Sequence, residues 1–419
     1  MDKILVHGGA TLKGTVRISG SKNSALPILA ATLLTNDPCI VHRVPDLSDI
    51  HYMLTILSHL GCDVERASGT VQVKAAQLRT EAPYEIVRKM RASVCVLGPL
   101  LGREKEATVS LPGGCVIGDR PIDLHLKGFE ALGAAVRVQG GNVKVLAPRL
   151  KGALIDMRGK YGSTVLGTDN VMMAAVLAEG MTVIDGAAEE PEVVDLANFL
   201  IKMGAKIEGA GTSRIIIEGV KELHGAEHTV IPDRIEAGTF LVAGAIAGEE
   251  IILQKVNPQH LLSVTVPLQK AGYVVETNGE TLKLRRNGGS LPLELETEPY
   301  PGFPTDMQAQ MCALLATSPG TSRVTEHIFP QRFMHIAELK RMGADIELEN
   351  ATAVIRGVGQ LSGAPVMASD LRASAALVLA GLRAEGITEI NRVYHIDRGY
   401  ESIDEKLNLL GANIERVKA

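Results

Sequence analysis

A glycine-rich segment sets a cysteine close to an arginine, a combination that can carry acid–base or covalent chemistry. In the 111–123 segment, glycines flank Cys115 on both sides and Arg120 follows five residues later. The glycines predict a flexible, exposed loop, and a nearby cation favours the thiolate or anchors an anionic substrate beside it. The alternative for Cys115 is a small buried hydrophobe, the role we expect for the remaining cysteines, Cys39, Cys62, Cys95 and Cys312. No second cysteine or histidine stands at metal-ligand spacing, so we expect no metal site.

Cations stand where apolar helices are expected to begin. Lys22 follows a Gly-Ser pair at such a start, where free N–H groups and the positive dipole end favour anions. The segment is not a Walker loop, because Gly-x-x-x-x-Gly-Lys-(Ser/Thr) is absent. Further arginines occupy similar places or a nearby loop: Arg91, Arg234, Arg372 and Arg398. A single arginine at a helix start is usually a surface charge, but several in a chain of net charge −5 predict a shared cleft for phosphate or carboxylate groups.

One carboxylate is a candidate proton acceptor. Asp306 directly follows a proline-rich turn at residues 299–304 and precedes an apolar helix. A carboxylate there can cap the helix, which stabilises it by about 1 kcal/mol. In a cationic cleft it can instead take a proton from a substrate hydroxyl. The local sequence leaves both interpretations open.

Composition bounds the elements that must position these residues. The chain has 419 residues, of which 46% are apolar, and single cores seldom grow beyond about 250–300 residues, so we expect more than one domain. The negative net charge and the scarcity of aromatic residues argue against nucleic acid and membrane partners. The N-terminus lacks the basic and apolar regions of a signal peptide, so we expect a cytoplasmic protein. Six apolar stretches, each too short to span a bilayer, predict six buried helices at 24–34, 93–101, 171–177, 237–247, 309–316 and 373–382.

An internal repeat organises the chain. The pattern Leu-x-x-(Leu/Met)-Gly-(Ala/Cys)-x-(Val/Ile) recurs, more loosely once, with its glycine at intervals of 68 to 72 residues, at Gly61, Gly133, Gly204, Gly272, Gly343 and Gly411. Each copy predicts a surface helix that ends at a glycine C-cap and turns into a strand. Six units of about 70 residues, three to a domain, give two domains of ordinary size.

The ordered motifs make the chain resemble the UDP-N-acetylglucosamine 1-carboxyvinyltransferase family of enolpyruvyl transferases. The motifs are Gly20-Ser21-Lys22-Asn23, Lys89-Met90-Arg91-Ala92-Ser93, Pro112-Gly113-Gly114-Cys115, Glu190-Pro191-Glu192, Pro232-Asp233-Arg234-Ile235-Glu236, Phe303-Pro304-Thr305-Asp306-Met307-Gln308, Arg332-Phe333-Met334-His335 and His395-Ile396-Asp397-Arg398-Gly399-Tyr400. The resemblance implies an α/β (α+β) fold, a two-domain inside-out α/β barrel with helices buried and sheets outside. It further implies that residues 22–230 form the first domain with a lid at 111–123, and that 1–21 and 231–419 form a discontinuous second domain.

The resemblance also implies a reaction. The family transfers the enolpyruvyl group of phosphoenolpyruvate to the 3-hydroxyl of UDP-N-acetylglucosamine and releases phosphate, which is the first committed step of peptidoglycan synthesis. We therefore expect a cytoplasmic transferase with these two small-molecule substrates and no cofactor.

Site residues are carried over by position. Cys115 would be the general acid, able to form an adduct with phosphoenolpyruvate, and Asp306 would take the proton from the sugar 3-hydroxyl. The phosphoenolpyruvate contacts would be Lys22, Asn23, Arg91, Arg120, Arg372 and Arg398. The UDP-sugar contacts would be Asn23, Arg91, Arg120, Pro121, Ile122, Asp123, Leu124, Asp306 and Ile328.

Two departures and two alternatives accompany the resemblance. Ser48 stands where some relatives carry lysine, and the 161–169 segment differs from the family's Ser-Val-Gly-Ala-Thr run beside the nucleotide. A 5-enolpyruvylshikimate-3-phosphate synthase is one alternative, against which the Cys115 segment argues. An inactive homologue that senses nucleotide sugars is the other, against which the retained cysteine, aspartate and arginines argue.

Overall fold

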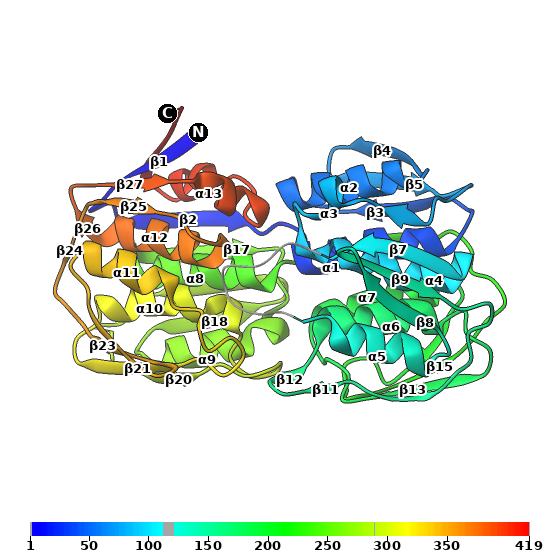
Figure 1. Cartoon of the computed structure of the whole chain (residues 1–419). Helices are drawn as coiled ribbons and strands as arrows, with labels where there is room; N and C mark the ends of the chain where they lie inside the picture. Colours follow the sequence, from blue (N-terminus) through cyan, green and yellow to red (C-terminus); the bar gives the residue numbers. More distant parts are fainter. Residues whose placement is uncertain (1, 112–120, 289, 419) are drawn as a thin grey trace. The chain divides into compact units, whose positions relative to one another are not determined.

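The chain folds into two compact units with nearly equal internal packing. The computed structural model describes residues 2–111, 121–288 and 290–418. Among the described residues, the central unit comprises 20–111 and 121–231, and the terminal unit comprises 2–19, 232–288 and 290–418, so that it contains the segments from both ends of the chain (Figure 1).

The six predicted buried helices are present. In the central unit they are α1 (Lys22–Ala31), α4 (Leu97–Glu104) and α6 (Val165–Ala175); in the terminal unit they are α8 (Arg234–Ala247), α10 (Gln308–Ala316) and α12 (Leu371–Arg383). All thirteen residues from Arg234 to Ile246 of α8 are buried, which matches a helix without a polar face. The stretch at 93–101 differs in detail, because it begins as the 3₁₀ segment η2 (Arg91–Val96) and becomes α-helical only at Leu97.

Six further helices lie on the outside and end in the predicted glycine turns. They are α2 (Ser48–His59), α5 (Asp123–Ala131), α7 (Pro191–Lys202), α9 (Leu262–Lys270), α11 (Met334–Arg341) and α13 (Ile403–Leu409). One capping residue separates each from its glycine, and all six glycines have φ between 90° and 102°. The residue after each glycine donates its N–H to the carbonyl five residues back, as in a Schellman motif. The six-fold repeat is confirmed.

Three four-stranded sheets surround the buried helices of each unit. In the central unit the orders are β16 (Glu227–Thr229)-β3 (Cys39–His42)-β5 (Thr70–Lys74)-β4 (Asp63–Ala67), β6 (Glu81–Ala82)-β7 (Glu106–Ser110)-β9 (Asn142–Leu146)-β8 (Ala135–Gln139) and β10 (Leu154–Asp156)-β13 (Met181–Asp185)-β15 (Arg214–Glu218)-β14 (Lys206–Glu208). In each, the strand after a buried helix pairs in parallel with an edge strand and antiparallel with a hairpin strand. The described sheets are separate and do not close into one continuous barrel.

The terminal unit repeats this plan with strands from both ends of the chain. Its sheet orders are β18 (Val274–Asn278)-β19 (Thr281–Arg285)-β17 (Gly248–Gln254)-β2 (Leu12–Arg17), β20 (Glu294–Glu296)-β21 (Thr321–Thr325)-β23 (Thr352–Arg356)-β22 (Asp345–Glu349) and β25 (Pro365–Met367)-β27 (Ile387–Asn391)-β1 (Asp2–His7)-β28 (Asn413–Lys418). Strand β1 takes the hairpin position between β27 and β28, and β2 is the parallel edge beside β17. The N-terminal strands therefore complete the first and last sheets of this unit.

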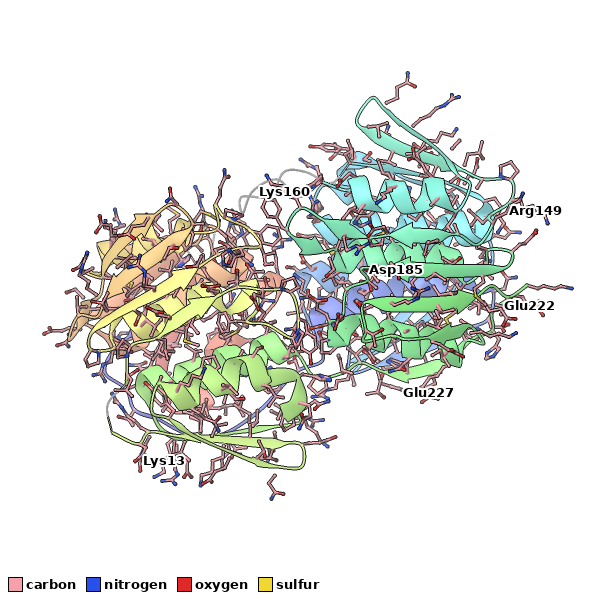
Figure 2. The ribbon with its side chains drawn as sticks, turned by 90° about the horizontal axis from the view of Figure 1, so that it is seen from below. Lys13, Arg149, Lys160, Asp185, Glu222 and Glu227 are labelled. Atoms are coloured by element: carbon pink, nitrogen blue, oxygen red, sulfur yellow. The ribbon has the colours of Figure 1, made fainter. Side chains whose placement is uncertain are left out.

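In both units most apolar side chains lie inside and most charged side chains lie on the outside. Charged side chains such as Lys13, Arg149 and Glu222 extend outward from the sheets and loops (Figure 2). The four cysteines expected in the core are buried, and burial raises the pKa of Cys62 to about 12. Within the described residues, no helix is long and apolar enough to cross a membrane.

Two turn glycines of the central unit differ in what surrounds them. Both Gly61 and Gly133 have φ near +100°, but a Cβ on Gly61 would lie 2.5 Å from the Gln77 carbonyl oxygen, whereas the nearest atom to one on Gly133 is 3.7 Å away. We expect Gly133→Ala to lower the free energy of unfolding by about 1–2 kcal/mol through backbone strain alone. Gly61→Ala should cost about 3 kcal/mol or more, because the strain and the clash add. Urea unfolding of both variants measures the difference, and equal losses would contradict it.

A buried carboxyl in α6 makes stability depend on pH. Asp169 is fully buried, and neither of its oxygens has a hydrogen-bond partner among the described residues. Burial, and then the nearby charges of Glu190 and Glu192, raise the pKa of Asp169 well above its usual value. The folded state therefore keeps a proton that the unfolded chain releases above about pH 4.

Replacing that carboxyl should remove the pH dependence. As pH rises above the unfolded pKa, proton retention costs the folded state about 1.4 kcal/mol per pH unit until the folded pKa is reached. Asp169→Asn cannot lose a proton, so its stability relative to wild type should increase from pH 4 toward pH 8. Urea unfolding across this range, with the exposed Asp63→Asn as control, measures the effect. Parallel pH curves for Asp169→Asn and wild type would contradict it.

Candidate active site

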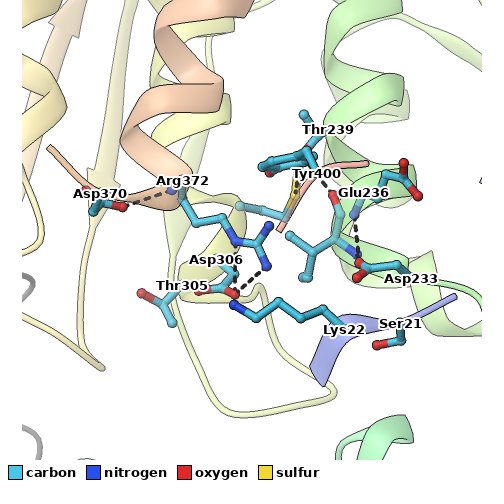
Figure 3. A network of polar contacts seen from close by, with 12 residues as sticks. Ser21, Lys22, Asp233, Glu236, Thr239, Thr305, Asp306, Asp370, Arg372 and Tyr400 are labelled. Atoms are coloured by element: carbon cyan, nitrogen blue, oxygen red, sulfur yellow. Dashed lines mark hydrogen bonds and ion pairs between the residues drawn. The ribbon is translucent and has the colours of Figure 1, made fainter. Parts of the chain in front are cut away.

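The candidate base of the terminal unit lies between two guanidinium groups. Asp306 is in the 3₁₀ turn η4 (Thr305–Met307) that precedes α10. Its Oδ1 accepts a hydrogen bond from Arg332 Nη1 at 2.8 Å. Its Oδ2 accepts from Arg372 Nε at 3.1 Å and Nη2 at 3.0 Å (Figure 3). The helix-cap interpretation is wrong, because neither η4 nor α10 receives a side-chain cap bond. The carboxylate binds cations instead of helix N–H groups.

These partners control the charge of Asp306. Its side chain is 29% exposed. Partial burial raises its pKa, but Arg372 and Arg332 together outweigh that effect and hold the pKa well below its usual value. Asp306 is therefore ionised at neutral pH. A carboxylate so stabilised is a weak base until a guanidinium is drawn away from it.

Arg372 is fixed from several sides. It lies in the first turn of α12, where the Asp370 side chain accepts hydrogen bonds from the Arg372 N–H at 2.9 Å and the next N–H at 3.2 Å. Its guanidinium lies over the ring of Tyr400, 5.2 Å from the centroid (Figure 3). The Tyr400 hydroxyl lies 2.9 Å from Thr239 Oγ1 and accepts from Gln310 Nε2 at 3.2 Å. The α8 and α10 helices thus support the ring that supports Arg372.

Arg398 ends the 3₁₀ segment η5 (Val393–Arg398), which packs against α12. The preceding Asp397 is bound by Arg416 at 2.9 Å and 3.0 Å. His395 is half-buried; burial, and then the Arg398 charge, lower its pKa. The segment that carries Arg398 is therefore held in two ways: Asp397 is bound by Arg416, and η5 packs against α12.

Lys22 is the first residue of α1 and is ion-paired. The Ser21 side chain caps the helix by accepting from Ser24 N at 3.3 Å. Lys22 Nζ lies 2.7 Å from Asp49 Oδ2 of α2, and both side chains are largely buried. Asn23 follows in the same turn and is half-buried. The ammonium is therefore positioned by a buried carboxylate.

Arg91 of the central unit lies close to a histidine that sequence reasoning missed. His125 of α5 is buried; burial, and then the Arg91 charge, lower its pKa to about 3. Its Nδ1 accepts from Asn170 Nδ2 at 2.9 Å, and that amide also binds Val94 O at 2.9 Å and Gly98 N at 2.8 Å. Asn170 thus ties η2, α4, α5 and α6 together around an uncharged imidazole. The only signal in the sequence was that His125 directly follows the predicted 120–124 contacts.

Other predicted residues fall around these groups. Ile122 caps α5 and is buried, Asp123 begins the helix, Leu124 is half-buried and Pro121 is exposed. Residues 112–120 of the predicted lid, with Cys115 and Arg120, lie outside the described residues.

The two departures from the family pattern have defined structures. Ser48 begins α2 and is half-buried. In the 161–169 segment, β12 (Gly162–Ser163) pairs with β11 (Arg158–Gly159). Thr164 then caps α6 by accepting from Gly167 N at 3.2 Å. The divergent segment is therefore a hairpin followed by a capped helix start.

The structure brings some predicted residues together and adds others. In the terminal unit Asp306 and Arg372 meet as predicted candidates, whereas Arg332 was matched only as part of a motif. Ile328 is half-buried, and its N–H is bound by Glu326 Oε1 at 2.8 Å. Among the residues in the described ranges, no group of three or more His, Cys, Asp or Glu is arranged to hold a metal ion.

Comparison with known proteins gives full-length matches. The profile of the EPSP synthase (3-phosphoshikimate 1-carboxyvinyltransferase) family matches residues 6–407. UDP-N-acetylglucosamine 1-carboxyvinyltransferase of Akkermansia muciniphila is 63% identical over 420 residues, covering 100% of this chain and 99% of the relative. The enzyme of that name from Methylacidiphilum infernorum is 60% identical over 417 residues, with coverage of 100% and 99%.

Solved structures agree with the predicted fold. The enolpyruvyl transferase NikO from Streptomyces tendae has a TM-score of 0.90 at 26% identity, covering 100% of this chain and 99% of that one. An EPSP synthase from Acinetobacter baumannii shares the fold with a TM-score of 0.77 at 19% identity and 100% coverage of both chains. Because the profile and the relatives span nearly the whole length at up to 63% identity, the chain belongs to the enolpyruvyl transferases, in the UDP-N-acetylglucosamine 1-carboxyvinyltransferase family.

Proposed function

We propose that this enzyme transfers the enolpyruvyl group of phosphoenolpyruvate to the 3-hydroxyl of UDP-N-acetylglucosamine, the first committed step of peptidoglycan synthesis. The observation that carries the proposal is the 63% identity to a relative of that name over the entire chain. The ionised Asp306 between two arginines supports it, because the reaction needs a proton acceptor in a site for anions.

The protons and bonds of the proposed reaction balance as an addition followed by an elimination. The sugar 3-oxygen bonds to C2 of phosphoenolpyruvate while Asp306 takes its proton, and the Cys115 thiol gives a proton to C3. The methyl group then returns a proton to the Cys115 thiolate, which restores the double bond as the C2–O bond to phosphate breaks. The departing phosphate takes up the hydroxyl proton held by Asp306. The role of Cys115, and its adduct with phosphoenolpyruvate, rest on the family resemblance. No cofactor is required, because side chains move both protons.

Cations hold the substrates in this proposal. Lys22, Arg120 and Arg398 bind the phosphate and carboxylate of phosphoenolpyruvate, with Asn23 beside them, and Arg91 and Arg372 add positive field. The UDP-sugar contacts Asn23, Arg91, Arg120, Pro121, Ile122, Asp123, Leu124, Asp306 and Ile328, and the 111–123 loop acts as the lid.

An anionic substrate also adjusts the base. Arg372 and Arg332 hold the Asp306 pKa well below its usual value. A carboxylate or phosphate that draws either guanidinium toward itself weakens that hold, so the Asp306 pKa rises when substrate is bound. The carboxylate thereby becomes a better base at the step that needs one. Both substrates are multiply charged and cross bilayers poorly, which supports a cytoplasmic location.

A turnover assay tests the function. We expect phosphate release when phosphoenolpyruvate and UDP-N-acetylglucosamine are supplied together, with a product whose mass equals that of the enolpyruvyl ether. Shikimate 3-phosphate in place of the UDP-sugar should release none. Turnover with shikimate 3-phosphate alone would establish the EPSP synthase alternative, and tight UDP-sugar binding without turnover would establish a sensor.

Removal of the proposed base should reduce the rate without unfolding the protein. Asp306→Asn keeps the shape of the side chain but cannot accept the hydroxyl proton, so kcat should fall about 10²–10⁴-fold. Asp345→Asn, on the outer strand β22 and ion-paired at the surface with Arg356, is the matched control. Steady-state kinetics with both substrates gives the ratio, and an Asp306→Asn rate within threefold of the control would refute the assignment.

A further inference from the structure

A buried carboxylate close to Asp306 accepts hydrogen bonds from four neutral donors among the described residues. Glu326 directly follows β21 and is fully buried. Its Oε1 accepts from Thr297 Oγ1 at 2.7 Å, from Ile328 N at 2.8 Å and from Phe329 N at 2.9 Å. Its Oε2 accepts from Thr305 Oγ1 at 2.9 Å. Burying a charge is costly unless hydrogen bonds compensate it, so four donors on one carboxylate call for an explanation.

One set of these bonds leads to Asp306. Thr305 gives its only hydroxyl proton to Glu326, so its lone pairs face Arg332 Nη1, which donates to them at 3.0 Å. The same Nη1 donates to Asp306 Oδ1 at 2.8 Å. The donors therefore all point one way, from Arg332 through Thr305 to Glu326. This chain of hydrogen bonds fixes the position of the Arg332 guanidinium. The guanidinium in turn fixes the position of Asp306 Oδ1, to which it donates.

The other set holds the segment that carries Ile328. The N–H groups of Ile328 and Phe329 both end on Glu326 Oε1. Thr297 reinforces the turn, because its hydroxyl donates to the same oxygen and accepts from His327 N at 2.9 Å. The backbone of residues 327–329 is thus folded around one carboxylate oxygen.

We propose that Glu326 is a positioning residue that orients the base Asp306 through Thr305 and Arg332, and the UDP-sugar contact Ile328 through the 327–329 backbone. This inference rests on the proposed function. Each oxygen of Glu326 serves one of the two tasks, so variants that remove one donor separate them.

The Thr305 arm should affect the chemical step. In Thr305→Val the Arg332 guanidinium loses its second acceptor and holds Asp306 less firmly. We expect kcat to fall about tenfold or more, the KM for UDP-N-acetylglucosamine to stay within twofold, and the acidic limb of the kcat–pH profile to move upward as the Asp306 pKa rises. Thr305→Ser retains the hydroxyl and should restore both kcat and the pH profile. If Thr305 only filled space, the smaller serine would not restore them.

The Thr297 arm should affect sugar binding. In Thr297→Val the 327–329 turn loses two hydrogen bonds, so the KM for UDP-N-acetylglucosamine should rise several-fold while kcat at saturation and its pH profile stay unchanged. Glu326→Gln disturbs both oxygens and should change both parameters. Thr325→Val is the matched control, because Thr325 neighbours Glu326 but its hydroxyl pairs with Thr352 Oγ1 at 2.9 Å.

The outcomes separate this inference from the proposed function. An inactive wild type would refute the function itself. An active wild type with Thr305→Val and Thr297→Val both matching Thr325→Val would overturn the Glu326 proposal alone. Equal changes of kcat and KM in both threonine variants, with no movement of the pH profile and no rescue by serine, would likewise overturn it, since they indicate general loosening.

Discussion

The burial of six helices that have no polar face constrains everything else in this protein. Such a helix must be covered along its whole length, and in each unit three sheets and three outer helices provide the cover. The ends of these helices remain accessible for chemistry. Lys22 begins α1, Arg372 stands in the first turn of α12, and Asp306 lies in the 3₁₀ turn before α10. These three candidate residues therefore lie at or just before the N-terminal ends of buried helices, where polar backbone groups are accessible.

Charges brought to the edge of an apolar core must be compensated, and the compensation shapes the chemistry. Asp306 is held by Arg332 and Arg372, and Lys22 by Asp49. Removing one member of such a pair leaves the other uncompensated, which is costly at low dielectric. An anionic substrate avoids that cost because it replaces one anion with another. Such ion pairs are therefore suited to exchange one anion for another, which is how the proposed substrates would adjust the base Asp306.

The repeat and the local identity of its elements were predictable because their causes are local. A run such as 237–247 has no polar face, so it had to be buried, and each glycine of the repeat follows an amphipathic stretch at the position where a left-handed turn is needed. Asp306 shows where this reasoning stops. Its neighbours in the chain suggested a helix cap, but its partners stand 26 and 66 residues further along. The residues next to a carboxylate in the chain do not indicate which distant arginine will form an ion pair with it in the folded protein.

The amino-acid sequence is sufficient to predict the six-fold architecture, the placement of the buried helices and, through its motifs, the family. Those properties follow from hydrophobic periodicity, turn chemistry and ordered short motifs, each of which is readable over a few residues. Packing between distant elements makes Asp306 an ionised partner of two arginines, keeps His125 uncharged through burial beside Arg91, and gathers four donors on Glu326. These depend on distances and burial between elements far apart in the chain, because pKa and hydrogen-bond geometry are set by what packing brings within about 3–6 Å.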